Sequence, residues 1–114
     1  MIGEILAKYP ETDFPANRQK RIETLAEPYA KLKEKWAHRV PPKWYGFDLY
    51  DVPARWLQII DEFLEYIEKQ DPEMEIHQIK LKFGGLRFYV NCDPRFKDEI
   101  AILEEHLYDP RLIH

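Results

Sequence analysis

The segment IHQIKLKFGGLRFYVNC, Ile76 to Cys92, constrains the fold of this chain more than any other part of the sequence. Two runs in which apolar and polar residues alternate flank a Gly-Gly pair. Alternation with a period of two is typical of strands with one buried face, and a diglycine connection favours the tight turns that join antiparallel strands. The segment therefore predicts a β-hairpin with Gly84 and Gly85 as its loop.

This loop sets the register of the predicted hairpin. Because side chains alternate along a strand, one face collects the apolar residues and is expected to pack on the core. A slip by one residue would turn the charged residues inward, so the choice of face is strongly specified. The cross-strand pairs expected on the buried face are Phe83–Leu86, Leu81–Phe88, Ile79–Val90 and His77–Cys92.

The other face of the hairpin is predicted to carry most of the candidate binding residues. Lys82 would lie opposite Arg87, and Lys80 opposite Tyr89. Like charges directly opposite each other are mildly unfavourable. Carboxylates of the acidic helix, an anionic partner, or water and salt must therefore compensate them. Lys80, Lys82, Arg87 and Tyr89 are the candidate binding residues of this face.

Three helices are predicted around the hairpin. Apolar residues recur at helical spacing over residues 18–36, and their phase is kept across Pro28, so we expect one kinked helix rather than two. A second amphipathic helix is expected over residues 51–67, opened by an aspartate and a proline. A third follows Asp93-Pro94, where aspartate is a favourable N-cap.

The order α-α-β-β-α predicts an α+β fold, with a small antiparallel hairpin sheet packed against three helices. Residues 2–8 are compatible with one further helical turn or two. A length of 114 residues, of which 45% are hydrophobic, is enough to bury a core. We therefore expect residues 1–114 to form a single domain.

The connection VPPKWYGFDLYDVP, residues 40–53, is too aromatic for a free linker. We expect it either to pack over the edge of the core or to form a recognition surface, because aromatic residues are enriched where partners bind. Trp44 and Tyr45 are its candidate binding residues. A two-stranded sheet is marginal by itself. Helices could cover its edges, residues 45–50 could add a strand, or a second copy could pair edge to edge; the sequence does not choose, although we favour a homodimer.

Charge is segregated along the chain, although the net charge is only −4. Residues 18–43 and 76–97 are mainly basic, whereas residues 48–75 are mainly acidic. These blocks either neutralise one another in the fold or leave separate charged surfaces for partners. The net charge argues against generic binding to a polyanion.

The sequence also predicts where the protein works. The N-terminus lacks the pattern of a signal peptide, and no segment approaches the roughly 20 apolar residues that span a bilayer. The one cysteine, Cys92, can form no internal disulfide, so no oxidising compartment is needed. We expect a cytoplasmic protein that does not contact a membrane.

No catalytic motif stands out. His77 and Cys92 are predicted to be cross-strand neighbours, a pairing that can activate a thiolate, but no third residue would orient them. The histidines show no ligand spacing with one another or with Cys92, and no phosphate-binding glycine loop is present. We expect no metal and no cofactor, and we favour a protein that is not an enzyme.

The motif IKLKFGGLRFYV resembles a motif of short, uncharacterised proteins of bacteriophages and prophages, in which a K-x-K-F-G-x-L-R-F-Y-V hairpin follows a helix that opens near a tryptophan. Here Trp56 would open that helix, and the resemblance covers roughly the C-terminal half. Some proteins of this kind continue into a C-x-x-C tail, which this chain lacks. The resemblance implies a viral or mobile-element protein that modulates host machinery in the host cytoplasm.

Three hypotheses of function follow. The first is an accessory protein that binds a protein partner through the hairpin and the aromatic connection. The second is nucleic-acid binding through the basic hairpin face, aided by Arg18, Lys20 and Arg21. The third is an enzyme with a pocket near His77 and Cys92.

Overall fold

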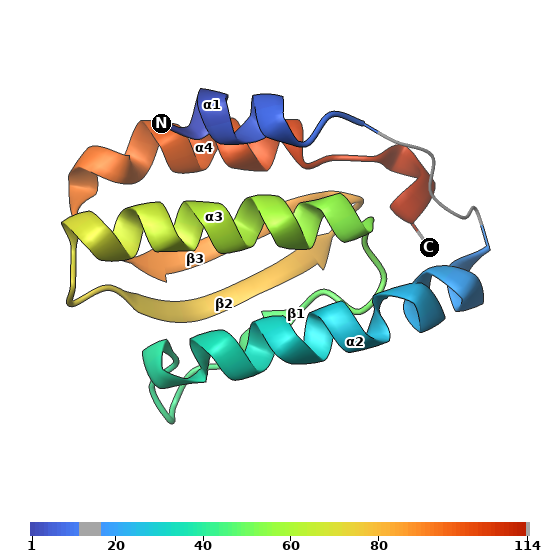
Figure 1. The fold of residues 1–114 in the computed structure, drawn as a ribbon, viewed down its shortest axis with the longest axis horizontal. Helices are drawn as coiled ribbons and strands as arrows, with labels where there is room; N and C mark the ends of the chain where they lie inside the picture. Colours follow the sequence, from blue (N-terminus) through green and yellow to red (C-terminus); the bar gives the residue numbers. More distant parts are fainter. Residues whose placement is uncertain (12–16, 114) are drawn as a thin grey trace.

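The structure, a computed structural model, describes residues 1–11 and 17–113. It has two layers, a three-stranded sheet and a layer of helices over one face of that sheet (Figure 1). This confirms the predicted α+β class. The predicted order α-α-β-β-α is incomplete, because it omits the first helix and the first strand. The helices and strands are α1 (Ile2–Lys8), α2 (Arg18–Trp36), β1 (Gly46–Asp48), α3 (Ala54–Gln70), β2 (Glu75–Lys82), β3 (Gly85–Asn91) and α4 (Lys97–His106).

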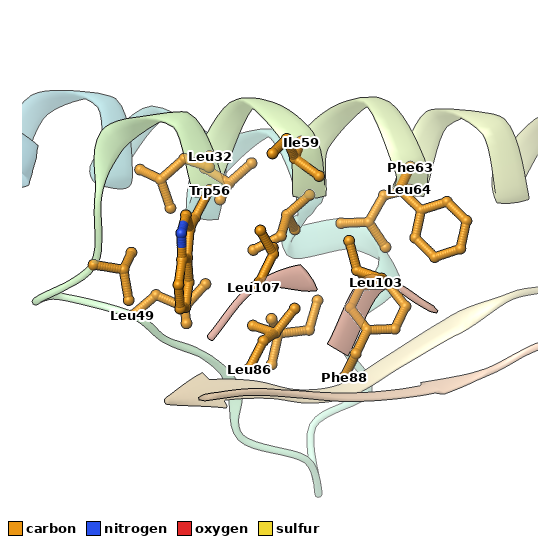
Figure 2. Packing of buried hydrophobic residues seen from close by; sticks show 14 of the residues in the cluster. Leu32, Leu49, Trp56, Ile59, Phe63, Leu64, Leu86, Phe88, Leu103 and Leu107 are labelled. Atoms are coloured by element: carbon orange, nitrogen blue, oxygen red, sulfur yellow. The ribbon is translucent and has the colours of Figure 1, made fainter. Parts of the chain in front are cut away.

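α3 is the central helix of the helical layer (Figure 1). Its apolar residues recur every three or four positions and form a wide stripe, which allows the helix to be buried along its length. The predicted amphipathic helix is confirmed, but it begins at Ala54, after the aspartate and the proline that were expected to open it. Figure 2 shows side chains of α3 packed over those of β3, and the ring centroids of Phe63 and Phe88 are 5.5 Å apart. The buried residues of α3 are Trp56, Leu57, Ile59, Ile60, Phe63, Leu64 and Ile67.

α2 runs without a break through Pro28, as the phase of its apolar residues predicted. It begins after Asn17, whose side chain accepts a hydrogen bond from the backbone N–H of Lys20 at 3.0 Å. Such a cap satisfies one of the free N–H groups at the start of a helix. The hydroxyl of Tyr29 accepts a hydrogen bond from the backbone N–H of Leu49 at 2.8 Å, which ties the connection after β1 to α2.

The aromatic connection contributes a strand, one of the three alternatives left open by the sequence. β1 pairs in parallel with β2, so that Phe47 lies beside Ile79 and Asp48 beside Lys80. The sheet is therefore mixed, in the order β1-β2-β3, and the prediction of a purely antiparallel sheet is wrong. Parallel neighbours need a long crossover connection, and α3 provides it.

The predicted hairpin forms from β2 and β3, but its loop lies one residue earlier than expected. Lys82 pairs with Gly85, so the loop is Phe83-Gly84. These two residues have φ angles of 54° and 79°, and two positive φ angles are what a type I′ turn requires. Gly85 instead belongs to β3 and forms a bridge with Tyr108, in the segment that follows α4. The observed loop thus leaves Gly85 free to pair with the C-terminal segment.

The change of loop alters the partners across the hairpin and leaves most residues on their predicted faces. Ile79 lies opposite Phe88, and Leu81 opposite Leu86. The predicted pairs Leu81–Phe88 and Ile79–Val90 are therefore wrong. β3 keeps its alternation, and β2 keeps it from Gln78 to Lys82, so that Ile79, Leu86 and Phe88 are buried. Phe83 is the exception: it was expected in the core and is 73% exposed at the tip of the hairpin.

α4 and the residues after it cover the edge of β3 that faces away from β2. The carboxylate of Glu104 accepts a hydrogen bond from the backbone N–H of Phe88 at 2.8 Å. The backbone N–H of Leu86 donates to the carbonyl of Leu107 at 2.9 Å. Unpaired donors on an edge strand invite another strand, and at these two positions the donors are already used.

Candidate sheet-face interface

One face of the sheet is turned away from the helices, and the predicted hairpin site lies there. Figure 2 shows the core side chains on the α3 side of the strands. On the opposite side, the register aligns Asp48, Lys80 and Arg87 in one row across the three strands, and Gln78 with Tyr89 in the next. Lys82 follows toward the hairpin tip. We call this set the outer sheet face: Asp48, Gln78, Lys80, Lys82, Arg87 and Tyr89.

The three cations of the outer sheet face have no ion-pair partner among residues 1–11 and 17–113. Arg87 donates a hydrogen bond to the carbonyl of its neighbour Leu86 at 3.2 Å. The ammonium of Lys82 lies 5.6 Å from the ring centroid of Phe83. Lys80 pairs with Asp48 in the strand register, but their charged groups do not meet in a salt bridge.

The like-charge pair expected in the hairpin is present with different members. Lys82 was predicted opposite Arg87, whereas the structure places Lys80 opposite Arg87 and Lys82 opposite Gly85. Asp48 on β1 is the carboxylate next to this pair, and it comes from the aromatic connection rather than from the acidic helix. One exposed carboxylate beside three cations leaves the outer sheet face with an excess of positive charge.

His77 links Trp44 to the outer sheet face, although the sequence did not single out His77 as a binding residue. The ladder is interrupted between Ile76 and Gln78, so His77 is a bulge residue. It was predicted to point into the core opposite Cys92. Instead, its imidazole stacks on the indole of Trp44, with ring centroids 3.9 Å apart and an interplanar angle of 10°. A pattern of strict alternation contains no signal for such a bulge.

Trp44 and Tyr45 therefore lie at the end of the sheet where β1 begins. The backbone N–H of Tyr45 donates to the carbonyl of His77 at 3.1 Å, which holds this segment against β2. The side chain of Tyr45 is 78% exposed. Trp44 is partly exposed, but one face of its indole is covered by His77. Near the middle of the outer sheet face, Tyr89 is about half exposed.

Arg18 and Arg21 of α2, expected to aid nucleic-acid binding, are held by an internal carboxylate. Asp51 accepts hydrogen bonds from Arg21 at 2.9 Å and from Arg18 at 3.0 Å. The side chains of Asp51 and Arg21 are almost fully buried. Asp51 was predicted to open α3 through the helix dipole, and it serves this ion pair instead. Lys20, by contrast, is exposed.

The pair of His77 and Cys92 that was weighed as a catalytic site does not form as predicted. The last pair of the hairpin joins Glu75 to Asn91, so Cys92 lies beyond the ladder. Burial, together with the nearby charges of Asp71 and Asp93, raises the pKa of the Cys92 thiol. A raised pKa favours the unreactive thiol over the thiolate.

Among residues 1–11 and 17–113, no group of three or more histidine, cysteine, aspartate or glutamate residues could hold a metal ion. None of the helices in this part of the chain has the length and apolar character needed to cross a bilayer.

Comparison with known proteins yields no match: no family model, no curated protein and no solved structure is similar to this chain.

Proposed function

We propose that the protein binds a protein partner through the outer sheet face and that the partner presents an acidic surface. The observation that carries the proposal is the set of three cations, Lys80, Lys82 and Arg87, which have no ion-pair partner among the described residues. Elsewhere in the molecule, most lysines and arginines of α2 contact carboxylates of the chain itself. Cations on a sheet face turned away from the helices, without an ion-pair partner among the described residues, are suited to carboxylates brought by another molecule.

The aromatic residues around this face support a protein partner. Tyr89 and Tyr45 offer large apolar surfaces with a polar tip, and aromatic residues with arginine are the groups that most often carry binding energy at protein interfaces. Trp44 is held in place by its stack on His77. A side chain that is already ordered loses little conformational entropy on binding.

The second candidate, single-stranded nucleic acid, is favoured by one observation. Tyr89 is exposed between basic side chains on an open sheet, an arrangement that could stack a base. Platforms of this type use several free aromatic faces, however, and one face of Trp44 is occupied by His77. The internal use of Arg18 and Arg21 removes further phosphate contacts. We therefore rank this function second.

Peptide display tests the first proposal by letting the protein select its own ligands. A random peptide library is selected on the wild-type protein and, in parallel, on Lys80→Glu/Arg87→Glu. We expect the wild type to enrich peptides rich in aspartate and glutamate and the variant to lose them. The matched control is Lys31→Glu/Lys33→Glu, which reverses two exposed cations on α2 and should enrich the same peptides as the wild type.

The outcome that contradicts the proposal is a selection in which wild type and variant enrich the same peptides or none. Titration with a single-stranded oligonucleotide at low and high salt tests the second candidate. If the oligonucleotide binds, and if this binding weakens steeply with salt and is lost in Lys80→Glu/Arg87→Glu, the partner of the outer sheet face is a nucleic acid and not an acidic protein.

The resemblance of the hairpin motif to phage and prophage proteins belongs to the same proposal. It supports an accessory protein that acts in the host cytoplasm by binding rather than by catalysis. Deletion of the gene from its phage or prophage, followed by complementation with Lys80→Glu/Arg87→Glu, tests this part. A variant that restores the phenotype as fully as the wild type would contradict it.

A further inference from the structure

The tip of the hairpin carries a residue that the turn itself does not favour. Phe83 has a φ angle of 54°, in the left-handed region that glycine and asparagine occupy most readily. Its side chain is 73% exposed, so burial in the core does not offset this strain. A bulky residue held in a strained backbone conformation on the surface indicates a role outside the fold.

A hollow lies directly beside this ring. It has a volume of about 210 Å³ and is lined by Phe83 together with Leu81, Leu112, Ile113 and the segment 48–51. Tyr50 and Ile113 on its walls are each about half exposed. Three large, exposed hydrophobic residues around one hollow form a patch of the kind that marks a binding surface.

The C-terminal segment holds the hollow and the tip together. The backbone N–H of Asp109 donates to the carbonyl of Gly84 at 2.8 Å. A Cβ on Gly84 would lie only 2.9 Å from Ile113 and 2.7 Å from the carbonyl oxygen of Asp109, so the tail packs tightly on the turn. Phe83 and the wall of the hollow are therefore parts of one ordered surface rather than of two independent loops.

The charges at this tip are complementary. Lys82 precedes Phe83 on the strand, and Asp48 lines the hollow. Both side chains are exposed, and neither forms an ion pair with a residue of the described parts of the chain. The surface thus offers a protruding aromatic ring, a hollow, a cation and an anion.

We infer that the hairpin tip is a self-association surface, at which Phe83 of each copy fills the hollow of the other. A two-fold contact brings the same patch of both copies together, so each patch must contain both the protrusion and the recess that receives it. This patch contains both. In the same arrangement Lys82 of each copy comes to face Asp48 of its partner, so that both charges of the tip are neutralised.

The edge-to-edge dimer considered from the sequence is a different arrangement. The N–H groups of Leu86 and Phe88 on the edge of β3 are already bonded within the chain. The inferred contact uses the tip instead and leaves the central row of the outer sheet face, Lys80 and Arg87, free for the proposed partner. The two proposals share Lys82 and Asp48, but their tests use different residues: Lys80 and Arg87 for the acidic partner, and Phe83 for self-association.

Sedimentation analysis of the full chain over a wide concentration range tests the inference. We expect the wild type to pass from monomer to dimer as concentration rises and Phe83→Asn to remain monomeric. Asn-Gly is the preferred pair of a type I′ turn, so Phe83→Asn should keep or raise the thermal unfolding midpoint of the monomer. Loss of the dimer could then not be attributed to misfolding.

Exchange of charges tests the geometry of the contact. Asp48→Lys and Lys82→Glu each place like charges opposite one another in a self-pair, so each variant alone should lose the dimer. An equimolar mixture of the two restores opposite charges at both positions and should form a heterodimer. Lys80→Glu/Arg87→Glu should dimerise like the wild type, and Phe83→Asn should still select acidic peptides.

The inference is overturned if the wild type stays monomeric at every concentration, or if Phe83→Asn associates as strongly as the wild type. It is also overturned if the mixed charge variants stay monomeric. A third outcome is a monomeric wild type that selects aromatic peptides, with this selection lost only in Phe83→Asn. The hollow would then bind a side chain of another protein.

Discussion

The basic residues of α2 and the basic residues of the outer sheet face have different surroundings. Along α2, Lys35 lies 2.9 Å from Asp61 and 2.6 Å from Glu65 of α3. In the turn that follows, Arg39 lies 2.9 Å from Glu68. We call these contacts the α2–α3 charge seam. On the sheet, Lys80 and Arg87 have no such carboxylate among the described residues.

The difference shows that segregated charge can serve two purposes in one small fold. The basic block 18–43 and the acidic block 48–75 largely neutralise each other, because the two helices pack side by side (Figure 1). Three cations of the third block, Lys80, Lys82 and Arg87, lie on the sheet face that points away from both helices. Their positive charge is therefore available to a partner, whereas that of the charge seam is not.

The largest expected loss of stability follows from breaking the buried ion pair between Asp51 and Arg21. Asp51→Ala leaves Arg21 buried without this carboxylate, and loss of one partner of a buried ion pair costs about 3–5 kcal/mol. Asp48→Ala is the matched control, because Asp48 is exposed and forms no ion pair with the described residues. Its free energy of unfolding should change by less than about 0.5 kcal/mol. Urea denaturation at low protein concentration measures both, and equal losses would contradict the contrast between paired and unpaired charges.

A smaller change in stability, this time an increase, is expected for a substitution at the hairpin tip. Phe83→Asn places a residue that tolerates positive φ in the turn, and relief of the left-handed conformation should raise the free energy of unfolding by about 1 kcal/mol. Thermal unfolding at low concentration provides the measurement. Destabilisation would show that the Phe83 ring stabilises its own fold, which would also remove the reason to assign it to an interface.

A still smaller difference in stability is expected between the removal of one lysine from the charge seam and the removal of one lysine from the outer sheet face. Lys35→Ala removes exposed ion pairs of the charge seam and should cost about 0.2–1 kcal/mol. Lys80→Ala removes no ion pair among the described residues, so we expect no loss of stability and a weaker binding of acidic peptides. The comparison fails if Lys80→Ala is as destabilising as Lys35→Ala in parallel urea titrations.

The smallest effect is a dependence on pH at the contact between α1 and α3. A hydrogen bond from the hydroxyl of Tyr9, at 2.6 Å, lowers the pKa of Glu62. A carboxylate whose pKa is lower in the folded state stabilises the protein at neutral pH, and this contribution is lost as the pH falls through the folded-state pKa. Tyr9→Phe should therefore be less stable than the wild type at neutral pH and should approach it on acidification. A gap that widens in acid would contradict this assignment.

The sequence predicted the elements that depend on local pattern. The stripe across Pro28 and the amphipathic pattern of α3 are properties of neighbouring residues, and both were found as predicted. The alternation of the hairpin was found between Gln78 and Lys82 and along β3, but not at the bulge residue His77 or at the exposed Phe83. The parallel pairing of β1 with β2 was open, because a three-residue strand has too little pattern to show its partner.

The candidate site was less predictable, because its details depend on contacts between distant segments. The turn lies at Phe83-Gly84, where the segment around Asp109 packs on Gly84. The bulge at His77 accompanies its stacking on Trp44 from the aromatic connection. The buried pair of Asp51 with Arg21 joins α2 to the start of α3. No local pattern around any of these residues indicates its partner.

The most direct test of the central claim is an NMR titration of the isotope-labelled protein with an acidic peptide selected on the wild type. If the unpaired cations form the interface, the amide signals that shift will be those of β2 and β3 around Lys80, Arg87 and Tyr89. Signals of the α2–α3 charge seam should stay in place. Shifts concentrated around Lys35 and Arg39, with an unchanged sheet, would contradict the account.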